Sequence, residues 1–209
     1  DISESRLDSY HMPDAYRTWL TTGIYKTLEA PPTISVRTPE QQKPHTELQK
    51  KILRLVWEYF EHHPFLFELF AAEVYKLHDP HVVVDEITRK SVDGGRDAFG
   101  KIMYGIREDA IPIHFALEAK CYQPGLDNNR INTVGVKEVS RLISRIRNRE
   151  VGVLVTTSII AKQAYEEVRQ DGHPIVFITG KDIAEILIVN GYSTSERVLT
   201  FLETNFPKQ

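Results

Sequence analysis

Apolar residues first recur at helical spacing near residue 46 of this chain. Thr46 followed three residues later by Gln49 is a capping-box pattern, which is typical of the start of a helix. The apolar spacing behind it predicts a helix to about His62, and Pro64 suits the first turn of a second helix that ends at residues 78–80. The pattern therefore predicts two helices before any strand.

From Val82 the pattern changes to β-branched residues. It predicts strands over 82–88 and 98–104, joined by a glycine turn at Gly94-Gly95, and a third strand over 113–120. The residues that follow alternate between helical and strand patterns, with elements predicted at 134–149, 151–156, 160–170, 175–179, 182–189 and 195–205. Because helices and strands alternate after a hairpin, we expect an α/β fold with a central mixed β-sheet flanked by helices.

The composition supports a globular core and excludes several classes of protein. The 209 residues are 41% hydrophobic and 26% charged, which is too apolar for a disordered chain, and the length allows one full domain with an extension or two small domains. No apolar run in the sequence approaches the roughly 18 residues of a membrane span, so no membrane partner is expected. Cys121 is the single cysteine, which excludes an internal disulfide and favours a reducing compartment. The net charge of −3 does not by itself indicate nucleic-acid binding.

Residues 1–45 differ in composition from the rest of the chain. Residues 1–44 hold five of the eleven prolines, around one predicted helix at about 15–28. We interpret 1–45 as an N-terminal arm or linker and 46–209 as the main domain. The chain begins with Asp1 rather than methionine, which suggests a fragment whose arm is the end of another, missing domain.

Two carboxylates and a lysine carry the chemistry that the pattern points to. Asp97 lies where the glycine turn leads into the second strand, while Glu118 and Lys120 alternate with Ala119 on the third strand and therefore share a face. If the strands are neighbours, these side chains meet at one end of the sheet, where paired carboxylates favour Mg²⁺ or Mn²⁺. Asp93 is the alternative to Asp97, which we favour because it directly follows Gly-Gly-Arg at the strand start.

The spacing of these residues resembles the PD-(D/E)xK nuclease motif, here without its proline. Asp97 is followed by twenty intervening residues and then by the tripeptide EAK at 118–120. The spacing alone leaves open an incidental Glu-Lys pair on a surface hairpin. The surrounding sequence resembles the Mrr-like restriction endonuclease domain across about residues 64–190. The matching segments are the Phe67-Glu68 pair, the GGRD turn, and the run GVLVTTSIIAKQAYEEV followed by ITGKDIAEIL. Within that group, VKEVSRLISRIRNREVGVLVTTS and DGHPIV are most similar to the cleavage domain of MspJI-like modification-dependent restriction enzymes.

The resemblance implies a role for each of these residues. Asp97 and Glu118 would hold Mg²⁺, with Mn²⁺ as a substitute, and the carbonyl of Ala119 would be a further ligand. Lys120 would be the catalytic lysine, and Glu68 matches a helix glutamate that some such nucleases add to the site. A solvent-facing helix residue is the alternative reading of Glu68. Many Mrr-like domains carry glutamine at the position of Glu118, and the acidic form should hold metal at least as well.

Basic residues follow one side of the predicted helix 134–149. Lys137, Arg141, Arg145 and Arg149 recur every four residues, and the opposite side is apolar. Such a row is usually a solvated surface. Next to a phosphodiester site, however, we expect it to contact the DNA backbone without reading sequence.

Two further features are candidate DNA contacts. Arg96 precedes Asp97 in the glycine turn. Thr156, Thr157 and Ser158 follow a strand and precede a helix, where hydroxyls and backbone N–H groups suit a phosphate. An N-cap of the helix that follows is the alternative role for these three residues.

Together these features predict a Mg²⁺-dependent endonuclease for double-stranded DNA, which is the cleavage domain of a modification-dependent restriction enzyme in a prokaryotic cytoplasm. Cutting both strands needs two sites, so a homodimer or higher homo-oligomer is expected. The resemblance places recognition of modified cytosine in an N-terminal domain outside this chain. The alternatives are a nuclease specific for branched DNA such as Holliday junctions, and a catalytically idle DNA-binding or assembly module of the same fold.

Overall fold

The computed structural model describes residues 35–87, 97–126 and 130–208, and from Val36 onward they form one compact unit. The helix expected at 15–28 and the turn that holds Asp93 and Arg96 lie outside the described residues. The α-helices are α3 (Pro39–Gln42), α4 (Glu47–Phe60), α5 (Pro64–His78), α6 (Val136–Ile143), α7 (Lys162–Gln170), α8 (Gly180–Val189) and α9 (Ser195–Asn205). The strands are β1 (Val82–Ile87), β2 (Ala98–Tyr104), β3 (Ile111–Lys120), β4 (Val151–Thr156) and β5 (Ile175–Ile178).

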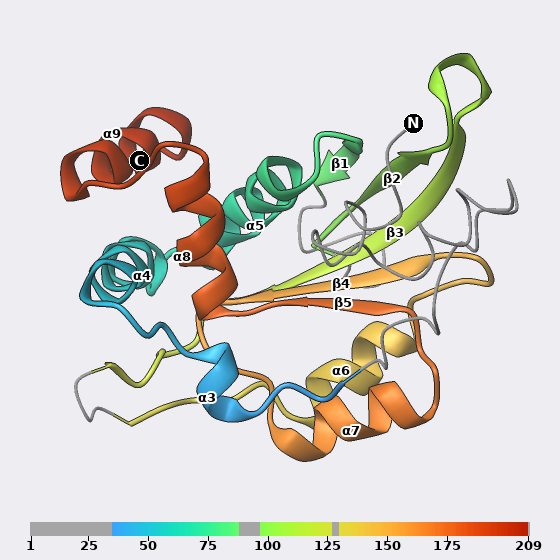
Figure 1. The fold of residues 1–209 in the computed structure, drawn as a ribbon, viewed down its shortest axis with the longest axis horizontal. Helices are drawn as coiled ribbons and strands as arrows, with labels where there is room; N and C mark the ends of the chain where they lie inside the picture. The colour runs from blue at the N-terminus through green and yellow to red at the C-terminus, as the bar shows by residue number, and fades with distance from the viewer. Residues whose placement is uncertain (1–34, 88–96, 127–129, 209) are drawn as a thin grey trace, which may run out of the picture. The chain divides into compact units, whose positions relative to one another are not determined.

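The five strands form one mixed sheet in the order β1-β2-β3-β4-β5 (Figure 1). β1, β2 and β3 pair antiparallel, whereas β3, β4 and β5 pair parallel. The parallel strands are joined through α6 and α7, because parallel neighbours need a long crossover connection rather than a tight turn. The expectation of an α/β fold with a mixed sheet flanked by helices is therefore confirmed.

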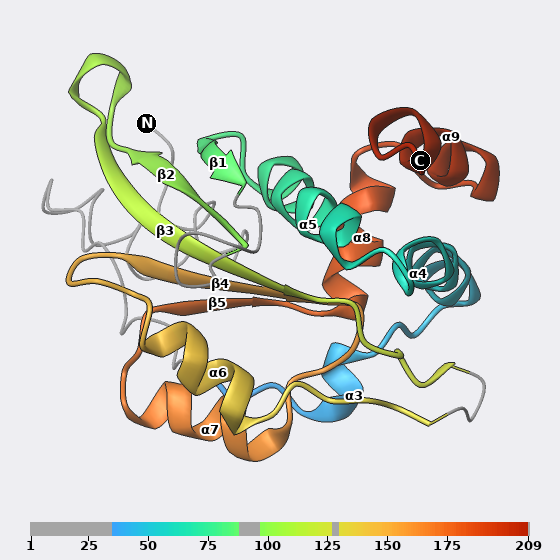
Figure 2. The same ribbon diagram turned by 180° about the vertical axis from the view of Figure 1, so that it is seen from behind.

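Helices cover both faces of the sheet (Figures 1 and 2). One layer contains α4, α5 and α8, whose aromatic residues such as Phe60 and Phe70 pack with Leu117 of β3. The other contains α6 and α7, which pack on Ala116 of β3 and Leu154 of β4. Because side chains alternate along a strand, Glu118 and Lys120 share the face of Ala116 and lie on the α6 side of the sheet.

Most predicted elements are confirmed within a few residues. Thr46 caps α4 as expected: its hydroxyl accepts from the N–H of Gln49, and the Gln49 side chain accepts from the N–H of Thr46. Pro64 begins α5, and the helix ends at His78. The local signals for caps and strands are strong because each depends only on neighbouring residues.

The basic helix is shorter than predicted, because α6 ends at Ile143 rather than at residue 149. The Ser144 hydroxyl donates to the carbonyl of Arg141, and Arg149 has a positive φ of 69° at the turn into β4. A residue at positive φ cannot continue a right-handed helix. Arg145 and Arg149 therefore lie beyond the helix, and the four basic residues do not form one helical row.

Residues 36–44 are tied into the compact unit, which thus begins before the expected boundary at residue 45. Gln42, at the end of α3, is fully buried. Its amide donates to the carbonyls of Arg37 at 3.2 Å and Ile160 at 3.3 Å, and its carbonyl oxygen accepts from the N–H of Ile160 at 2.8 Å. The end of α3 is thereby fixed to the segment between β4 and α7.

Replacement of Gln42 by alanine is expected to lower the free energy of unfolding by about 3 kcal/mol. The change leaves buried backbone groups of Ile160 without their partner and opens a cavity, and both effects destabilise. Denaturant titration would measure the change, with Glu40→Ala on the exposed side of the same short helix as the control. Equal stability of the two variants would show that α3 contributes little to the fold.

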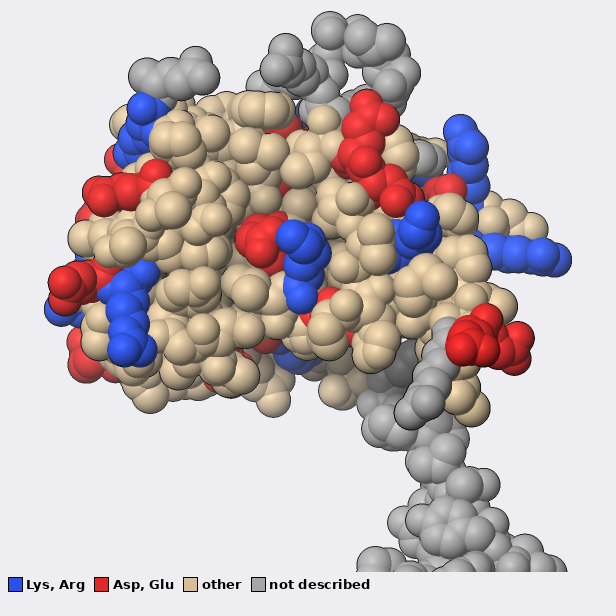
Figure 3. Space-filling model, turned by 90° about the horizontal axis from the view of Figure 1, so that it is seen from above, with Lys and Arg blue, Asp and Glu red and all other residues tan. Residues whose placement is uncertain are grey.

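No helix in the described ranges is long and apolar enough to cross a bilayer. Figure 3 shows the face that lies uppermost in Figure 1, where lysine, arginine and acidic side chains are interspersed and no broad patch of one sign is seen. On this face, charge does not mark a ligand surface.

Candidate active site

The end of β3 brings the predicted catalytic residues together. The register pairs Ala98 of β2 with Leu117 of β3, and the N–H of Asp97 donates to the carbonyl of Leu117 at 3.1 Å. Asp97 therefore lies beside Glu118, as expected if the two strands are neighbours. On its other side β3 pairs with β4, with Lys120 opposite Thr156.

Asp97 is held by the backbone of β3. Its Oδ2 accepts from the N–H of Ala119 at 2.7 Å, and the residue is only 9% exposed. Burial raises the pKa of the Asp97 carboxyl, whereas the Ala119 hydrogen bond and the charge of Lys120 act to lower this pKa. A nearby cation would favour the ionised form and offset the cost of burial.

Glu118 is fully buried and carries three cationic neighbours. The Lys120 Nζ lies 2.8 Å from its Oε1, the Arg145 Nη1 lies 3.5 Å from its Oε2, and the Arg141 Nε lies 3.7 Å from Oε1. A buried carboxylate needs such partners, because transfer of its charge out of water is costly. The basic repeat predicted a DNA-facing row but gave no sign that Arg141 and Arg145 lie against Glu118, because this contact joins residues far apart in the chain.

The donor set fits a small hard cation. Asp97 and Glu118 supply carboxylate oxygens, and the carbonyl of Ala119, the residue after Glu118, accepts from the Lys120 Nζ at 3.2 Å. Within the described part of the chain, no three or more His, Cys, Asp or Glu side chains gather as a ready-made metal cluster. The set is thus two carboxylates and a backbone carbonyl, which are oxygen ligands of the kind that Mg²⁺ and Mn²⁺ prefer.

The structure separates the two readings of Glu68. This residue of α5 is 7% exposed, so the solvent-facing alternative is wrong. Lys137 and Arg141 are both exposed on α6, with 49% of the Arg141 side chain exposed, so these two members of the basic row keep the expected solvated position within the helix. The proposed contact through Arg96 lies outside the described residues.

Thr156, Thr157 and Ser158 are buried rather than displayed on the surface. The hydroxyls of Thr156 and Thr157 donate to the carbonyls of Lys120 at 2.8 Å and Tyr122 at 2.5 Å. The expected alternative, an N-cap of the next helix, is wrong, because α7 is preceded by Ala161 and has no side-chain cap. These two hydrogen bonds connect the end of β4 to the end of β3 and the residues after it, and so fix the backbone of Lys120.

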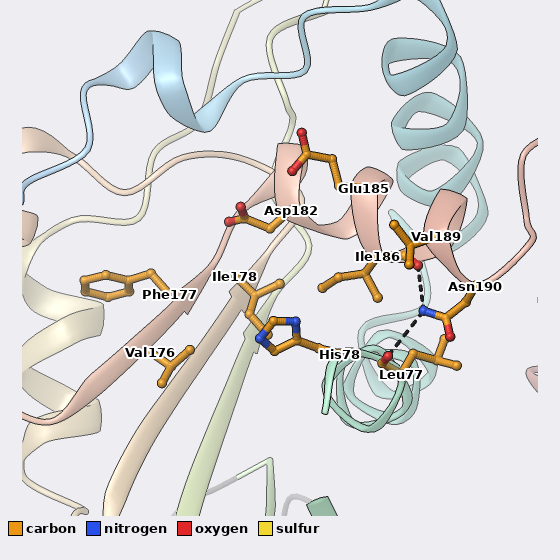
Figure 4. Close-up of a pocket in the computed structure, with 10 residues that line it drawn as sticks. All are labelled: Leu77, His78, Val176, Phe177, Ile178, Asp182, Glu185, Ile186, Val189 and Asn190. Atoms are coloured by element: carbon orange, nitrogen blue, oxygen red, sulfur yellow. Dashed lines mark hydrogen bonds between the residues drawn. The ribbon is translucent and has the colours of Figure 1, made fainter. Parts of the chain in front are cut away.

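A separate pocket of about 320 Å³ lies where the ends of α5 and α8 meet β5 (Figure 4). The Asn190 amide closes one side by donating to the carbonyls of Leu77 at 3.2 Å and Ile186 at 2.8 Å. None of the predicted catalytic residues lines this pocket. The pocket is therefore not the site at the end of β3.

Comparisons with known proteins agree with this geometry. A family model described as restriction endonuclease matches residues 54–187, which is more than half of the chain. The solved structure of the DNA modification-dependent restriction endonuclease AspBHI is 40% identical, with a TM-score of 0.79, over 93% of this chain and 49% of AspBHI.

A second structure, of MspJI restriction endonuclease in complex with a 27-mer oligonucleotide, shares the fold. It is 24% identical, with a TM-score of 0.74, over 95% of this chain and 45% of MspJI. The chain thus spans about half the length of either solved relative. No curated protein sequence matched it. The family model and the 40% identity to AspBHI show that the chain belongs to the restriction endonuclease family.

Proposed function

We propose that this chain is the cleavage domain of a modification-dependent restriction enzyme and hydrolyses phosphodiester bonds of double-stranded DNA with Mg²⁺. The observation that carries the proposal is the meeting of Asp97, Glu118 and Lys120 at the end of β3, in a member of the restriction endonuclease family. Two buried carboxylates with a lysine beside them are suited to phosphodiester hydrolysis.

Each residue has a distinct role in this proposal. Asp97, Glu118 and the carbonyl of Ala119 would hold the metal, which when bound polarises the scissile phosphate and lowers the pKa of a bound water. Lys120 orients the attacking water, or offsets negative charge as it builds on the phosphate oxygens. Glu68 assists from α5, where its burial keeps the carboxylate out of bulk solvent.

The DNA backbone is held by basic groups around this site. Arg141 and Arg145 lie within 4 Å of the Glu118 carboxylate, and we assign them, with Lys137 and Arg96, to phosphate contacts. Guanidinium groups match the geometry of phosphate oxygens and act without reading sequence. Binding should therefore weaken steeply as salt is added.

The remaining parts of the enzyme lie beyond this domain. The half of AspBHI that this chain does not span leaves room for a recognition domain, and we assign to it the reading of modified cytosine. Because one site cuts one strand, we propose a homodimer or higher homo-oligomer. We place the protein in the prokaryotic cytoplasm, because its proposed substrate is DNA and because a free thiol, here Cys121, is typical of a reducing compartment.

The test is cleavage of supercoiled plasmid, methylated at cytosine or unmethylated, by an excess of the chain in Mg²⁺, Mn²⁺ or EDTA. We expect nicked and linear products with either metal and none with EDTA. A parallel assay with a four-way junction separates the branched-DNA alternative, which predicts preferential cutting of the junction. A folded chain that cuts no substrate in either metal would contradict the proposal and favour the idle module.

A further inference from the structure

Three cationic side chains lie within 4 Å of the buried Glu118 carboxylate. Its single negative charge faces Lys120 from β3, Arg141 from α6 and Arg145 from the turn after α6. The carboxylate is fully buried, so water does not screen these interactions.

This arrangement opposes a divalent cation. An ion approaching Glu118 would meet three like charges within a few ångströms and would compete with them for the same carboxylate oxygens. Lys120 contacts Oε1 at 2.8 Å, and Arg145 occupies the Oε2 side at 3.5 Å. Glu118, one of the two carboxylates that are predicted to hold the metal, is therefore already engaged by the protein's own cations.

The two arginines differ from Lys120 in what they can reach. The Arg141 side chain is 49% exposed and the Arg145 side chain is 17% exposed, so both retain contact with solvent. They extend from α6 and the turn after it, whereas Lys120 is fixed on β3. A guanidinium group binds phosphate through paired hydrogen bonds, which makes a DNA phosphate a strong competitor for Glu118.

We propose that Arg141 and Arg145 are positioning residues that couple metal binding to DNA binding. Without DNA they stay on Glu118 and weaken metal binding. When a DNA phosphate draws them away, Glu118 is released for the metal. The inference rests on the proposed function, and it adds that the metal site is completed only on the substrate. By thermodynamic linkage, metal must then tighten DNA binding by the same factor.

The first test measures Mn²⁺ binding without DNA, by the electron paramagnetic resonance signal of the free ion. We expect Arg145→Gln to bind Mn²⁺ at least about fivefold more tightly than the unaltered chain. This is the lower end of the affinity changes that are typical when binding at two sites is coupled. Arg141→Gln should have a smaller effect, because that group is more exposed and more distant. Arg145→Lys, which keeps the charge, should stay near the unaltered chain.

Arg147→Gln is the matched control, because it removes the same charge from an exposed position in the same turn. It should change the Mn²⁺ affinity less than twofold. A merely structural role of Arg145 predicts the opposite sign, since loosening the site would weaken Mn²⁺ binding. Unchanged or weaker binding by Arg145→Gln would therefore overturn the inference.

The second test measures the coupling itself, by fluorescence anisotropy of a labelled duplex with and without Ca²⁺ at constant ionic strength. The unaltered chain should bind DNA at least about fivefold more tightly with Ca²⁺, and this gain should shrink in Arg145→Gln. Equal gains in both proteins would overturn the inference.

Plasmid cleavage separates this inference from the proposed function. If the unaltered chain cuts DNA with Mg²⁺ but Arg145→Gln does not bind Mn²⁺ more tightly, the coupling is overturned and the proposed function stands. A chain that neither cuts DNA nor binds Mn²⁺ in any of these variants would overturn both.

Discussion

Replacement of Lys120 by methionine is expected to reduce the rate of metal-dependent DNA cleavage by about 10³-fold, the size of effect seen for groups that stabilise charge or move a proton at the reacting centre. The Lys120 Nζ lies 2.8 Å from Glu118 and 3.2 Å from the carbonyl of Ala119, which are two of the three candidate metal ligands. Methionine keeps much of the volume and removes the charge together with the N–H donors of the ammonium group. Metal binding should persist, because Lys120 is not a ligand and its charge opposes the ion.

Single-turnover cleavage of a labelled duplex, together with Mn²⁺ titration of the same samples, would check this prediction. Lys101→Met is the matched control, because Lys101 lies on β2 of the same sheet and pairs with Asp85 at 3.3 Å. We expect its activity to stay within about twofold of the unaltered chain, as is usual for a partly exposed ion pair. A cleavage rate for Lys120→Met near that of the control would remove Lys120 from the mechanism.

Asp97→Asn is expected to lose cleavage as well, but by weakening the metal site. The asparagine oxygen can still accept from the N–H of Ala119, so the strand geometry is preserved while the negative charge is lost. Metal at 100 times its dissociation constant should stabilise the unaltered chain by about 2.7 kcal/mol, and this gain should be largely absent in the variant.

The stability of Asp97→Asn without metal provides the control. Because burial raises the pKa of Asp97, ionisation of this carboxyl costs folding free energy at neutral pH. The metal-free variant should therefore unfold at the same or a higher denaturant concentration than the unaltered chain. A strongly destabilised variant would mean that loss of cleavage reports misfolding, and retained Mn²⁺ stabilisation would exclude Asp97 as a ligand.

The same cluster explains why the two variants should differ although both remove one charge. Lys120 and the two arginines supply positive charge, and Asp97 and Glu118 supply the ligands. Removal of a ligand weakens metal binding, whereas removal of a cation favours it. Measurement of metal affinity and cleavage on the same samples therefore assigns each residue to one group or the other.

Local patterns were sufficient for most helices and strands. The Thr46 and Gln49 cap, the proline at the start of α5 and the strand Val151–Thr156 were all predicted at or near their observed positions. A cap depends on residues three apart, and a strand on alternation within a few residues, so the signal lies within a short window. The same alternation placed Glu118 and Lys120 on one face.

The end of α6 was beyond such local reasoning. The four-residue basic repeat favoured a helix to 149, but the chain turns after Ile143 and reaches Arg149 at a positive φ before entering β4. Periodicity reports which residues are compatible with a helix, whereas the end of this helix is set by where the chain must enter the sheet.

By itself, the sequence determined the class of fold and the order of the elements, because each depends on residue type and short spacing. Its resemblance to the Mrr-like domain, rather than the spacing alone, predicted the constellation of Asp97, Glu118 and Lys120. Only the tertiary structure decided which groups face Glu118, that Thr156 and Thr157 are buried against β3, and that Gln42 fixes α3 to the segment before α7. These contacts join residues distant in the chain, and their partners are chosen by burial and hydrogen-bond satisfaction across the whole fold.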